Sequence, residues 1–204
     1  MKKSTVLSGV AGIVILAILA FWLIGPQQSK EIKLFNGKDL NNWGFVLSDN
    51  AASAAKVFTV KDGVIHVTGS LGYMYTKEQY GNYKLHVEWR WPEEATNSGI
   101  FLLMTALNNP FPKGVECQLQ VNNAGDLIGV APGIQAKQNP SNEKPVGEWN
   151  TADIEVIAGH IRVSINGLFQ NEGTLQGGTS GNIGLQSEGK AIEFRNVYVI
   201  PLPE

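Results

Sequence analysis

The chain has only one cysteine, Cys117, among its 204 residues. A single cysteine cannot form an intrachain disulfide, and it excludes zinc and iron–sulfur sites built on paired cysteines. The three histidines, His66, His86 and His160, are too scattered in the sequence to form a metal-ligand motif. A Walker loop, a dinucleotide fingerprint, an HExxH motif and a GxSxG elbow are also missing. We therefore expect no cofactor and no resident metal.

Positive charge is scarce as well. The chain has 16 Lys and Arg against 18 Asp and Glu, and without Lys2 and Lys3 the remainder carries 14 − 18 = −4. This balance argues against a nucleic-acid groove and against a polybasic lipid-binding patch. With 43% hydrophobic and 17% charged residues, the chain has the composition of a folded protein and not of a disordered one.

One long apolar run, Val6 to Ile24, follows the two N-terminal lysines. Its 19 residues would span about 28 Å as a helix, close to the hydrocarbon thickness of a bilayer. The run stays bulky up to Gly25-Pro26 and lacks the small residues of a signal-peptidase site. We expect residues 1–25 to form an uncleaved transmembrane helix, with a cleaved signal and a secreted protein as the alternative. Lys2 and Lys3 then place the domain on the extracytoplasmic side.

After a linker at residues 26–30, residues 31–204 form one predicted domain made of short alternating runs. The dipeptide Asp62-Gly63 marks a hairpin, and Asn166-Gly167 marks another turn. Three strand pairs are predicted: 56–60 with 64–67, 154–157 with 161–165, and 183–186 with 191–199. This pattern predicts an all-β antiparallel sandwich or jelly roll.

Two central runs have a clear two-residue period. In residues 83–91 the alternation buries Tyr83, Leu85, Val87, Trp89 and Trp91 and presents Lys84, His86, Glu88 and Arg90. In residues 115–122 it buries Val115, Cys117, Leu119 and Val121 and presents Glu116, Gln118, Gln120 and Asn122. Cys117 is thus expected to fill the core and not to act as a nucleophile.

These two polar rows have two interpretations. They are either the solvated outer face of a sheet, or a shared site in which carboxylate, guanidinium and amide groups bind a polyol. Trp43 and Trp149 lie in loop-like contexts, where each would either stack on a sugar ring or cap the end of the core.

A series of short motifs carries a family resemblance: residues 34–43, 97–100, 116–118, 144–150, 165–167, 183–186 and 193–197, in this order. Together they resemble the 3-keto-disaccharide hydrolase domain family, formerly a domain of unknown function, over about residues 31 to 202. The resemblance implies a concanavalin/laminin-G-like jelly roll. It also implies hydrolysis of glycosides whose sugar is oxidised at C3, with no nucleotide cofactor.

The implied chemistry begins with removal of the C2 proton, which the C3 ketone makes acidic. The C1 substituent leaves by β-elimination, and water adds back at C1. Such a reaction needs a carboxylate base, donors for the enolate oxygen and an acid for the leaving group. On this resemblance, Glu116 and Glu88 are the expected acid and base, and the expected substrate-binding residues are Arg90, Asn97, Gln118, Trp149, Asn150, Asn166, Gln186 and Glu188.

The chain departs from the family pattern at two places. Many relatives carry an arginine shortly after the segment 97–100, where this chain has residues 101–104, Phe-Leu-Leu-Met. Many carry His-Gly after Gln186, where this chain has Ser187-Glu188-Gly189. Glu188 is either a replacement acid with a raised pKa or a surface turn residue.

The expected partners are an oxidised sugar or glycan and, through the N-terminal helix, a membrane; nucleic acid is not expected. A divalent cation between Glu88 and Glu116 is the alternative to a metal-free site. A non-catalytic carbohydrate-binding module and an envelope scaffold remain the alternative functions, because the fold alone does not determine the activity.

Overall fold

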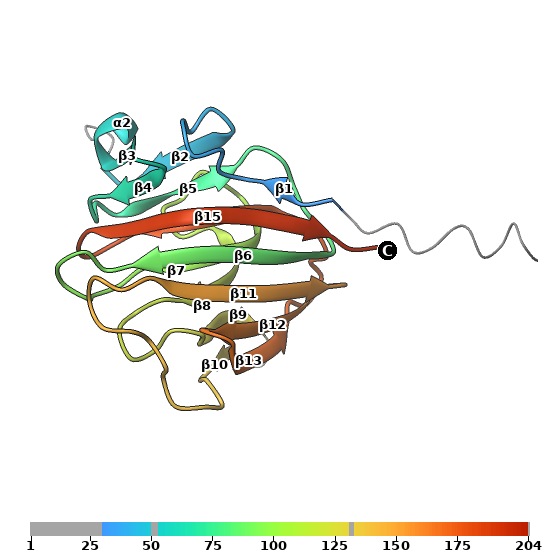
Figure 1. The fold of residues 1–204 in the computed structure, drawn as a ribbon. Helices are drawn as coiled ribbons and strands as arrows, with labels where there is room; N and C mark the ends of the chain where they lie inside the picture. Colours follow the sequence, from blue (N-terminus) through green and yellow to red (C-terminus); the bar gives the residue numbers. More distant parts are fainter. Residues whose placement is uncertain (1–29, 50–52, 131–132, 204) are drawn as a thin grey trace, which may run out of the picture.

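The computed structural model describes residues 30–49, 53–130 and 133–203 as two β-sheets packed face to face (Figure 1). The expected transmembrane helix and almost all of the linker lie outside the described residues. Within the described ranges, no helix has the length and apolar character needed to cross a membrane.

The sheet nearer the viewer in Figure 1, here called the front sheet, has eight antiparallel strands. β1 (Ile32–Lys33) adds to it by pairing with β15. The other seven run in the order β13 (Leu168–Thr174), β12 (His160–Ile165), β11 (Asn150–Ile157), β6 (Tyr83–Arg90), β15 (Ile192–Pro201), β4 (Val64–Val67) and β3 (Phe58–Lys61).

The back sheet has seven antiparallel strands, and the short helix α2 (Ala54–Val57) leads into β3 beside it. Its strand order is β10 (Gly133–Gln135), β9 (Leu127–Val130), β8 (Lys113–Gln118), β7 (Gly99–Thr105), β14 (Asn182–Ser187), β5 (Gly72–Thr76) and β2 (Trp43–Leu47). The predicted all-β antiparallel sandwich is therefore confirmed.

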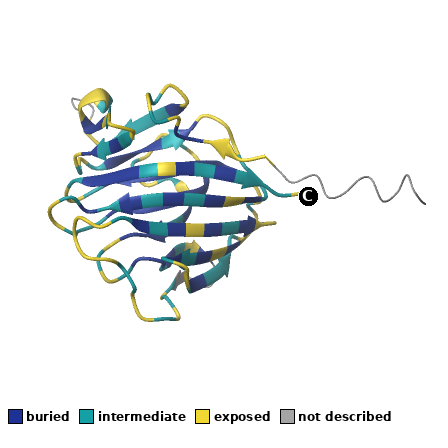
Figure 2. Cartoon of the chain, in the orientation of Figure 1, coloured by how far each residue is buried: buried dark blue, intermediate teal, exposed yellow. Residues whose placement is uncertain are grey.

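The core lies between the two sheets, and burial alternates along the strands as the two-residue period predicts (Figure 2). Leu85, Val87 and Trp89 of β6 are buried, and so are Val115 and Cys117 of β8. The predicted inward faces and the core-filling role of the cysteine are confirmed. Only the end of the second run is wrong: β8 stops at Gln118, so Val121 falls in a turn and is half-buried.

Two predicted hairpins are confirmed, but the first strand of one begins at Phe58 and not at residue 56, because residues 54–57 form α2. β3 and β4 turn at Asp62 and Gly63, which have φ angles of 52° and 75°, and β11 pairs with β12 as expected. The third predicted pair is wrong, because β14 belongs to the back sheet and β15 to the front sheet. Residues 188–191 therefore carry the chain from one sheet to the other.

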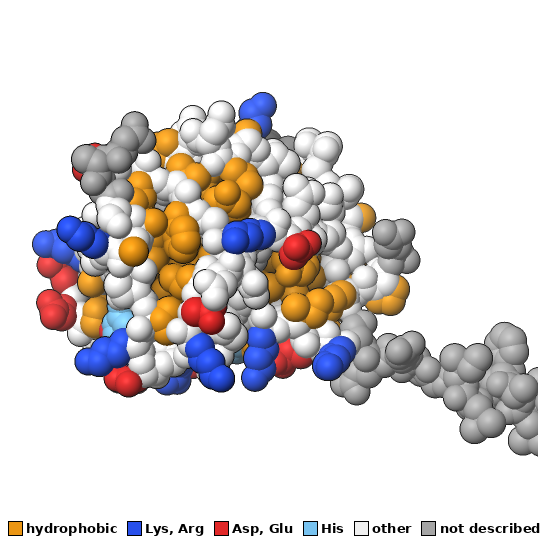
Figure 3. Space-filling model, turned by 90° about the horizontal axis from the view of Figure 1, so that it is seen from above, with side chains coloured by type: hydrophobic (Ala, Val, Ile, Leu, Met, Phe, Trp, Pro, Cys, Tyr) orange, Lys and Arg blue, Asp and Glu red, His pale blue; other side chains and the backbone are white. Residues whose placement is uncertain are grey.

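Trp43 is 2% exposed and donates its indole N–H to the Leu34 carbonyl at 3.0 Å. It seals the core and offers no ring face to a sugar. Figure 3 looks down on the edge formed by β1, β2 and α2. Hydrophobic side chains gather in the middle of this view, and most charged side chains, of both signs, lie along its margins.

Candidate active site on the back sheet

The two polar rows predicted from the sequence lie on opposite sides of the molecule. β6 is in the front sheet and β8 in the back sheet, and the inward faces of both strands pack in the core. Glu88 and Arg90 therefore face outward from the front sheet, whereas Glu116 faces outward from the back sheet. The expectation of a shared face is wrong, because two packed sheets separate the carboxylates by the thickness of the core. Glu88 and Glu116 can neither act on one sugar nor share a cation.

Glu88 is part of an ion-pair network on the front sheet. Its carboxylate accepts hydrogen bonds from Arg195 Nε and Asn196 Nδ2, each at 2.6 Å. Desolvation raises the pKa of Glu88, but these hydrogen bonds and the Arg195 charge outweigh it, so the pKa lies below its usual value. Glu88 thus holds β6 to β15 as an ionised group and is not placed to act on a substrate proton.

Arg90 belongs to the same network. Its Nε donates to Glu193 Oε2 at 2.5 Å, and Glu193 Oε1 also contacts His66 Nδ1 at 2.9 Å. The Trp149 ring lies against two guanidinium groups, with Arg90 at 4.6 Å and Arg195 at 4.0 Å from its centroid. Arg90 and Trp149 thus take part in packing across the front sheet, away from Glu116 on the back sheet.

Asn150 and Asn166 hold a loop in place. Asn150 Oδ1 accepts hydrogen bonds from the Lys144 backbone N–H at 2.8 Å and from Asn166 Nδ2 at 2.9 Å. Asn166 Oδ1 accepts from the Thr151 backbone N–H at 2.9 Å. Because their amides are occupied by the protein itself, the structure gives both residues a positioning role on the side of the front sheet.

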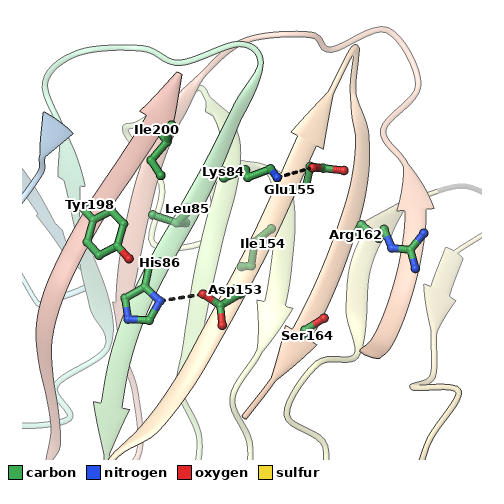
Figure 4. A pocket seen from close by; sticks show the side chains of 10 residues that line it. All are labelled: Lys84, Leu85, His86, Asp153, Ile154, Glu155, Arg162, Ser164, Tyr198 and Ile200. Carbon is green, nitrogen blue, oxygen red and sulfur yellow. Dashed lines mark hydrogen bonds and ion pairs between the residues drawn. The ribbon is translucent and has the colours of Figure 1, made fainter. Parts of the chain in front are cut away.

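The front sheet also carries a shallow pocket of about 320 Å³, shown in Figure 4. His86 Nδ1 contacts Asp153 Oδ1 at 2.7 Å and the His86 ring stacks on Tyr198. The hydrogen bond to Asp153 is the main cause that raises the pKa of His86. Lys84 pairs with Glu155 across the same pocket at 3.4 Å. The acids and bases described for this pocket thus neutralise one another in pairs.

Glu116 is in a different situation on the back sheet. It lies between Phe101 of β7 and Ile128 of β9 in register, and its Oε1 atom is buried with no hydrogen-bond partner. Burial, and to a lesser extent the nearby charge of Glu188, raise the pKa of Glu116 to about 7. A carboxyl group with this pKa exchanges protons readily at neutral pH.

Three further predicted residues lie on the same side as Glu116. Gln186 is 2% exposed, and its Nε2 donates to Glu188 Oε2 at 2.9 Å. Because Leu185 pairs with Ile100, Gln186 is next to Gly99, which in turn pairs with β8. Gln186 Oε1 and Asn97 Oδ1 are buried without a partner, as is Glu116 Oε1. Buried acceptors without donors are costly, and a bound hydroxyl group would satisfy them.

Gln118 has a supporting role at this end of β8. Its Oε1 accepts hydrogen bonds from the backbone N–H groups of Leu119 and Gln120, each at 2.9 Å. These bonds fix the turn that follows the strand. The structure therefore brings together Asn97, Glu116, Gln118, Gln186 and Glu188 from the predicted set and separates them from the other five.

The sequence interpretation missed an aromatic cluster that begins beside the acid at Phe101. Tyr73 and Phe101 meet edge to face with their centroids 5.5 Å apart, and with Met104 they form a small hydrophobic cluster on the outside of the back sheet. Tyr73 also donates its hydroxyl to the Asn109 carbonyl at 3.0 Å, which ties down the β7–β8 loop. The alternation in Tyr73-Met74-Tyr75 was the available signal, since Met74 is the core residue and the tyrosines face outward.

The arrangement suits acid–base chemistry on a polyol. Glu116 and Glu188 are two carboxyl groups close enough to influence each other, and the amide groups of Asn97 and Gln186 supply hydrogen-bonding atoms. Across the described ranges, no group of three or more His, Cys, Asp and Glu side chains is placed to hold a metal ion.

Comparisons with known proteins identify the family and the fold. A family model described as a 3-keto-alpha-glucoside-1,2-lyase-like domain matches residues 30–200, which confirms the resemblance read from the sequence motifs. A curated 3-keto-disaccharide hydrolase from Bacteroides thetaiotaomicron is 27% identical over 164 residues, covering 64% of this chain and 53% of that protein. This chain thus spans about half the length of that curated relative.

Two solved structures illustrate the shared fold. One, from Parabacteroides distasonis ATCC 8503 and provisionally described as a glycosyl hydrolase, has a TM-score of 0.68 at 24% identity, covering 85% of this chain and 100% of that one. The other, the carbohydrate-binding module CBM66 from Bacillus subtilis, has a TM-score of 0.56 at 9% identity, covering 76% and 93%. These likenesses establish the jelly-roll sandwich.

Proposed function

This chain belongs to the family of 3-keto-alpha-glucoside-1,2-lyase-like domains, and on that premise we propose that it cleaves glycosides whose sugar carries a ketone at C3. The observation that carries the proposal is the Glu116 carboxyl group, which is buried beside unpartnered amide oxygens and has a pKa of about 7. The name of the curated relative, 3-keto-disaccharide hydrolase, supports the same substrate class.

In the proposed reaction, the C3 ketone acidifies the proton on C2 of the sugar. A carboxylate takes this proton, the C1–O bond breaks, and the leaving oxygen receives a proton, which leaves a C1=C2 double bond conjugated to the ketone. Water then adds its hydroxyl to C1 and returns a proton to C2. The net change is hydrolysis, and no electron is transferred to a cofactor.

Glu116 is the proposed acid–base group, because burial keeps its two protonation states close in free energy at neutral pH. Glu188 is the proposed second carboxyl group, in place of Glu88, which is committed to Arg195. The free oxygens of Asn97 and Gln186 are proposed to accept hydrogen bonds from hydroxyl groups of the sugar. Gln118 would support the site by fixing the chain beyond β8.

The test compares 3-keto-trehalose with unoxidised trehalose. The parent should cleave the glycosidic bond of 3-keto-trehalose and not that of trehalose. Glu116→Gln should lower kcat/KM for 3-keto-trehalose by about 100-fold or more, the usual contribution of general acid–base catalysis. Glu155→Gln is the matched control, because Glu155 pairs with Lys84 on the front sheet and should leave cleavage unchanged. Cleavage by Glu116→Gln at the parental rate would overturn the assignment.

A binding module without catalysis is the second candidate, favoured by the fold shared with CBM66. In that case the parent would bind glucosides without cleaving any 3-keto substrate. Calorimetry on the same substrates separates the two functions.

We also propose that residues 6–24 anchor the domain to a membrane on its extracytoplasmic side. The proposal is supported by the length of the apolar run and by the preceding lysines. Cell fractionation followed by N-terminal sequencing tests it. A mature protein that begins near residue 25 would replace the anchor by a cleaved signal.

A further inference from the structure

We propose that an apolar pocket beside Glu116 binds the aglycone of the substrate and that this aglycone is an aromatic group and not a second sugar. The inference deepens the proposed function and rests on it. The pocket encloses about 250 Å³ on the outside of the back sheet, and its lining includes Glu116, Phe101, Phe111, Pro112, Ile128 and Gly114.

The pocket lining is almost entirely apolar. Glu116 is the only ionisable side chain that lines it, and no other lining residue has a side-chain hydrogen-bonding group. A sugar in this space would bury several hydroxyl groups without partners, which is unfavourable. An aromatic ring needs no such partners and would gain from the removal of its surface from water.

Glu116 lies at the boundary between this pocket and the polar group of Asn97, Gln186 and Glu188. On β7, Gly99 lies next to Gln186, whereas Phe101, two residues further along, pairs with Glu116 and lines the pocket. β8 runs in the opposite direction, so Gly114 lies still further from the polar group. The carboxyl group therefore has hydrogen-bonding atoms on one side and apolar walls on the other. This is the placement needed at a bond between a sugar and an apolar leaving group.

The fold holds the walls of the pocket in place. Phe101 is 5% exposed and is held by the edge-to-face contact with Tyr73, whose hydroxyl fixes the β7–β8 loop through Asn109. Phe111, in the same loop, lines the pocket and is 59% exposed. The Phe111 ring can cover a ring bound in the pocket.

The charge of the lining agrees with this assignment. None of the residues that line the pocket is a lysine or arginine. A ligand group that is uncharged and poor in hydroxyls matches these walls.

The test measures kcat/KM of the purified full chain for phenyl 3-keto-glucoside and for 3-keto-trehalose. The parent should prefer the phenyl substrate by more than about tenfold, because phenol is the better leaving group and its ring is buried in the pocket. Phe111→Ser, which keeps the difference in leaving group but removes the ring over the pocket, should lower the ratio of the two constants by about tenfold. Leu168→Ser, which changes another exposed apolar residue on the front sheet, should leave the ratio as it is in the parent. An equal or reversed preference in the parent would overturn the inference while leaving the proposed function intact.

A binding measurement separates this inference from the reaction. Phenyl glucoside and methyl glucoside, neither of them oxidised, are titrated into the parent and into Phe111→Ser. The parent should bind the phenyl compound about tenfold more tightly, and the variant should bind both equally. Phenyl selectivity without any cleavage would mean that the proposed function fails while the apolar subsite stands. Equal affinity in the parent would remove the subsite, whatever the activity.

Discussion

Gly99 lies directly against the Glu116 carboxylate: a Cβ atom added at Gly99 would come within 2.4 Å of Glu116 Oε1. The same Cβ would also meet Glu116 Cγ at 2.8 Å. Only a glycine in this position of β7 leaves the acid its present place on the neighbouring strand. The site therefore depends on a residue that has no functional group of its own.

We predict that Gly99→Ala lowers kcat/KM on 3-keto-trehalose by about tenfold or more, because it displaces the Glu116 side chain from its position. The fold should survive, since the clash is with a side chain that can rotate and not with the backbone. Enzyme kinetics and a thermal melt measure the two effects. Gly81→Ala, where the added Cβ would meet only the Thr179 carbonyl and the Ser180 side chain at 3.3 Å or more, is the control. Parental activity in Gly99→Ala would show that the carboxyl position is not critical.

The raised pKa of Glu116 predicts a pH-dependent stability. Its pKa is about 7 in the folded chain and near 4.5 when unfolded, so the protonated form favours folding. This contribution is fully present below pH 4.5 and is lost as the pH rises through 7, with a limit of about 3 kcal/mol. The side chain of Glu116→Gln cannot ionise, so the Tm of this variant minus the Tm of the parent should increase as the pH is raised from 5 to 8. Calorimetric melts at the two pH values test this, and the same difference in Tm at both would contradict it.

The sequence predicts which face of a strand is buried more easily than which sheet the strand joins. The alternation along β6 and β8 identified their inward residues correctly, because each strand has one face in the core. The pairing partners are set by segments far away: β6 lies between β11 and β15, and β8 lies between β7 and β9. No local pattern distinguishes a polar row on one sheet from a polar row on the other, so Glu88 and Glu116 appeared to share a face.

Irregular backbone in β7 is a second reason why part of the site cannot be predicted from the sequence. Leu103 has a φ angle of 52°, and the register between β7 and β8 shifts after Leu102. Leu102 and Leu103 are consecutive and both pack in the main core, where a two-residue period predicts alternation. The apolar pocket beside Glu116 also depends on the β7–β8 loop, whose path is fixed by the contact of Tyr73 with Asn109. Such long-range contacts are not readable from the sequence of the loop.

Trp89 provides a test of the core. Its side chain is 0% exposed and packs edge to face with Trp91 at 6.0 Å between ring centroids. We expect Trp89→Ala to reduce the free energy of unfolding by about 3 to 5 kcal/mol, because the space left between the sheets cannot collapse completely. Denaturant titration measures the change. A variant that unfolds at the same denaturant concentration as the parent would mean that the inward face of β6 is assigned incorrectly.

The corrected role of Glu88 leads to a final prediction, in which stability and activity separate. Glu88→Gln removes the charge that faces Arg195 Nε at 2.6 Å in a half-buried setting. We expect the free energy of unfolding to fall by about 1 to 2 kcal/mol. Cleavage of 3-keto-trehalose should remain within about twofold of the parent, since the side chain is on the opposite side of the sandwich from Glu116. Denaturation and kinetics on the same preparation measure both quantities.

The pH dependence of this variant has the opposite sign to that of Glu116→Gln. Because the pKa of Glu88 is lowered in the folded chain, its stabilising effect is present above pH 4.5 and disappears as the pH falls through the folded value. The stability gap between the parent and Glu88→Gln should therefore close on acidification. Glu172→Gln breaks a longer and more exposed pair with Arg162, at 3.6 Å, and should cost little at any pH. A large loss of turnover in Glu88→Gln with unchanged stability would return this residue to the catalytic site and contradict the separation of the two faces.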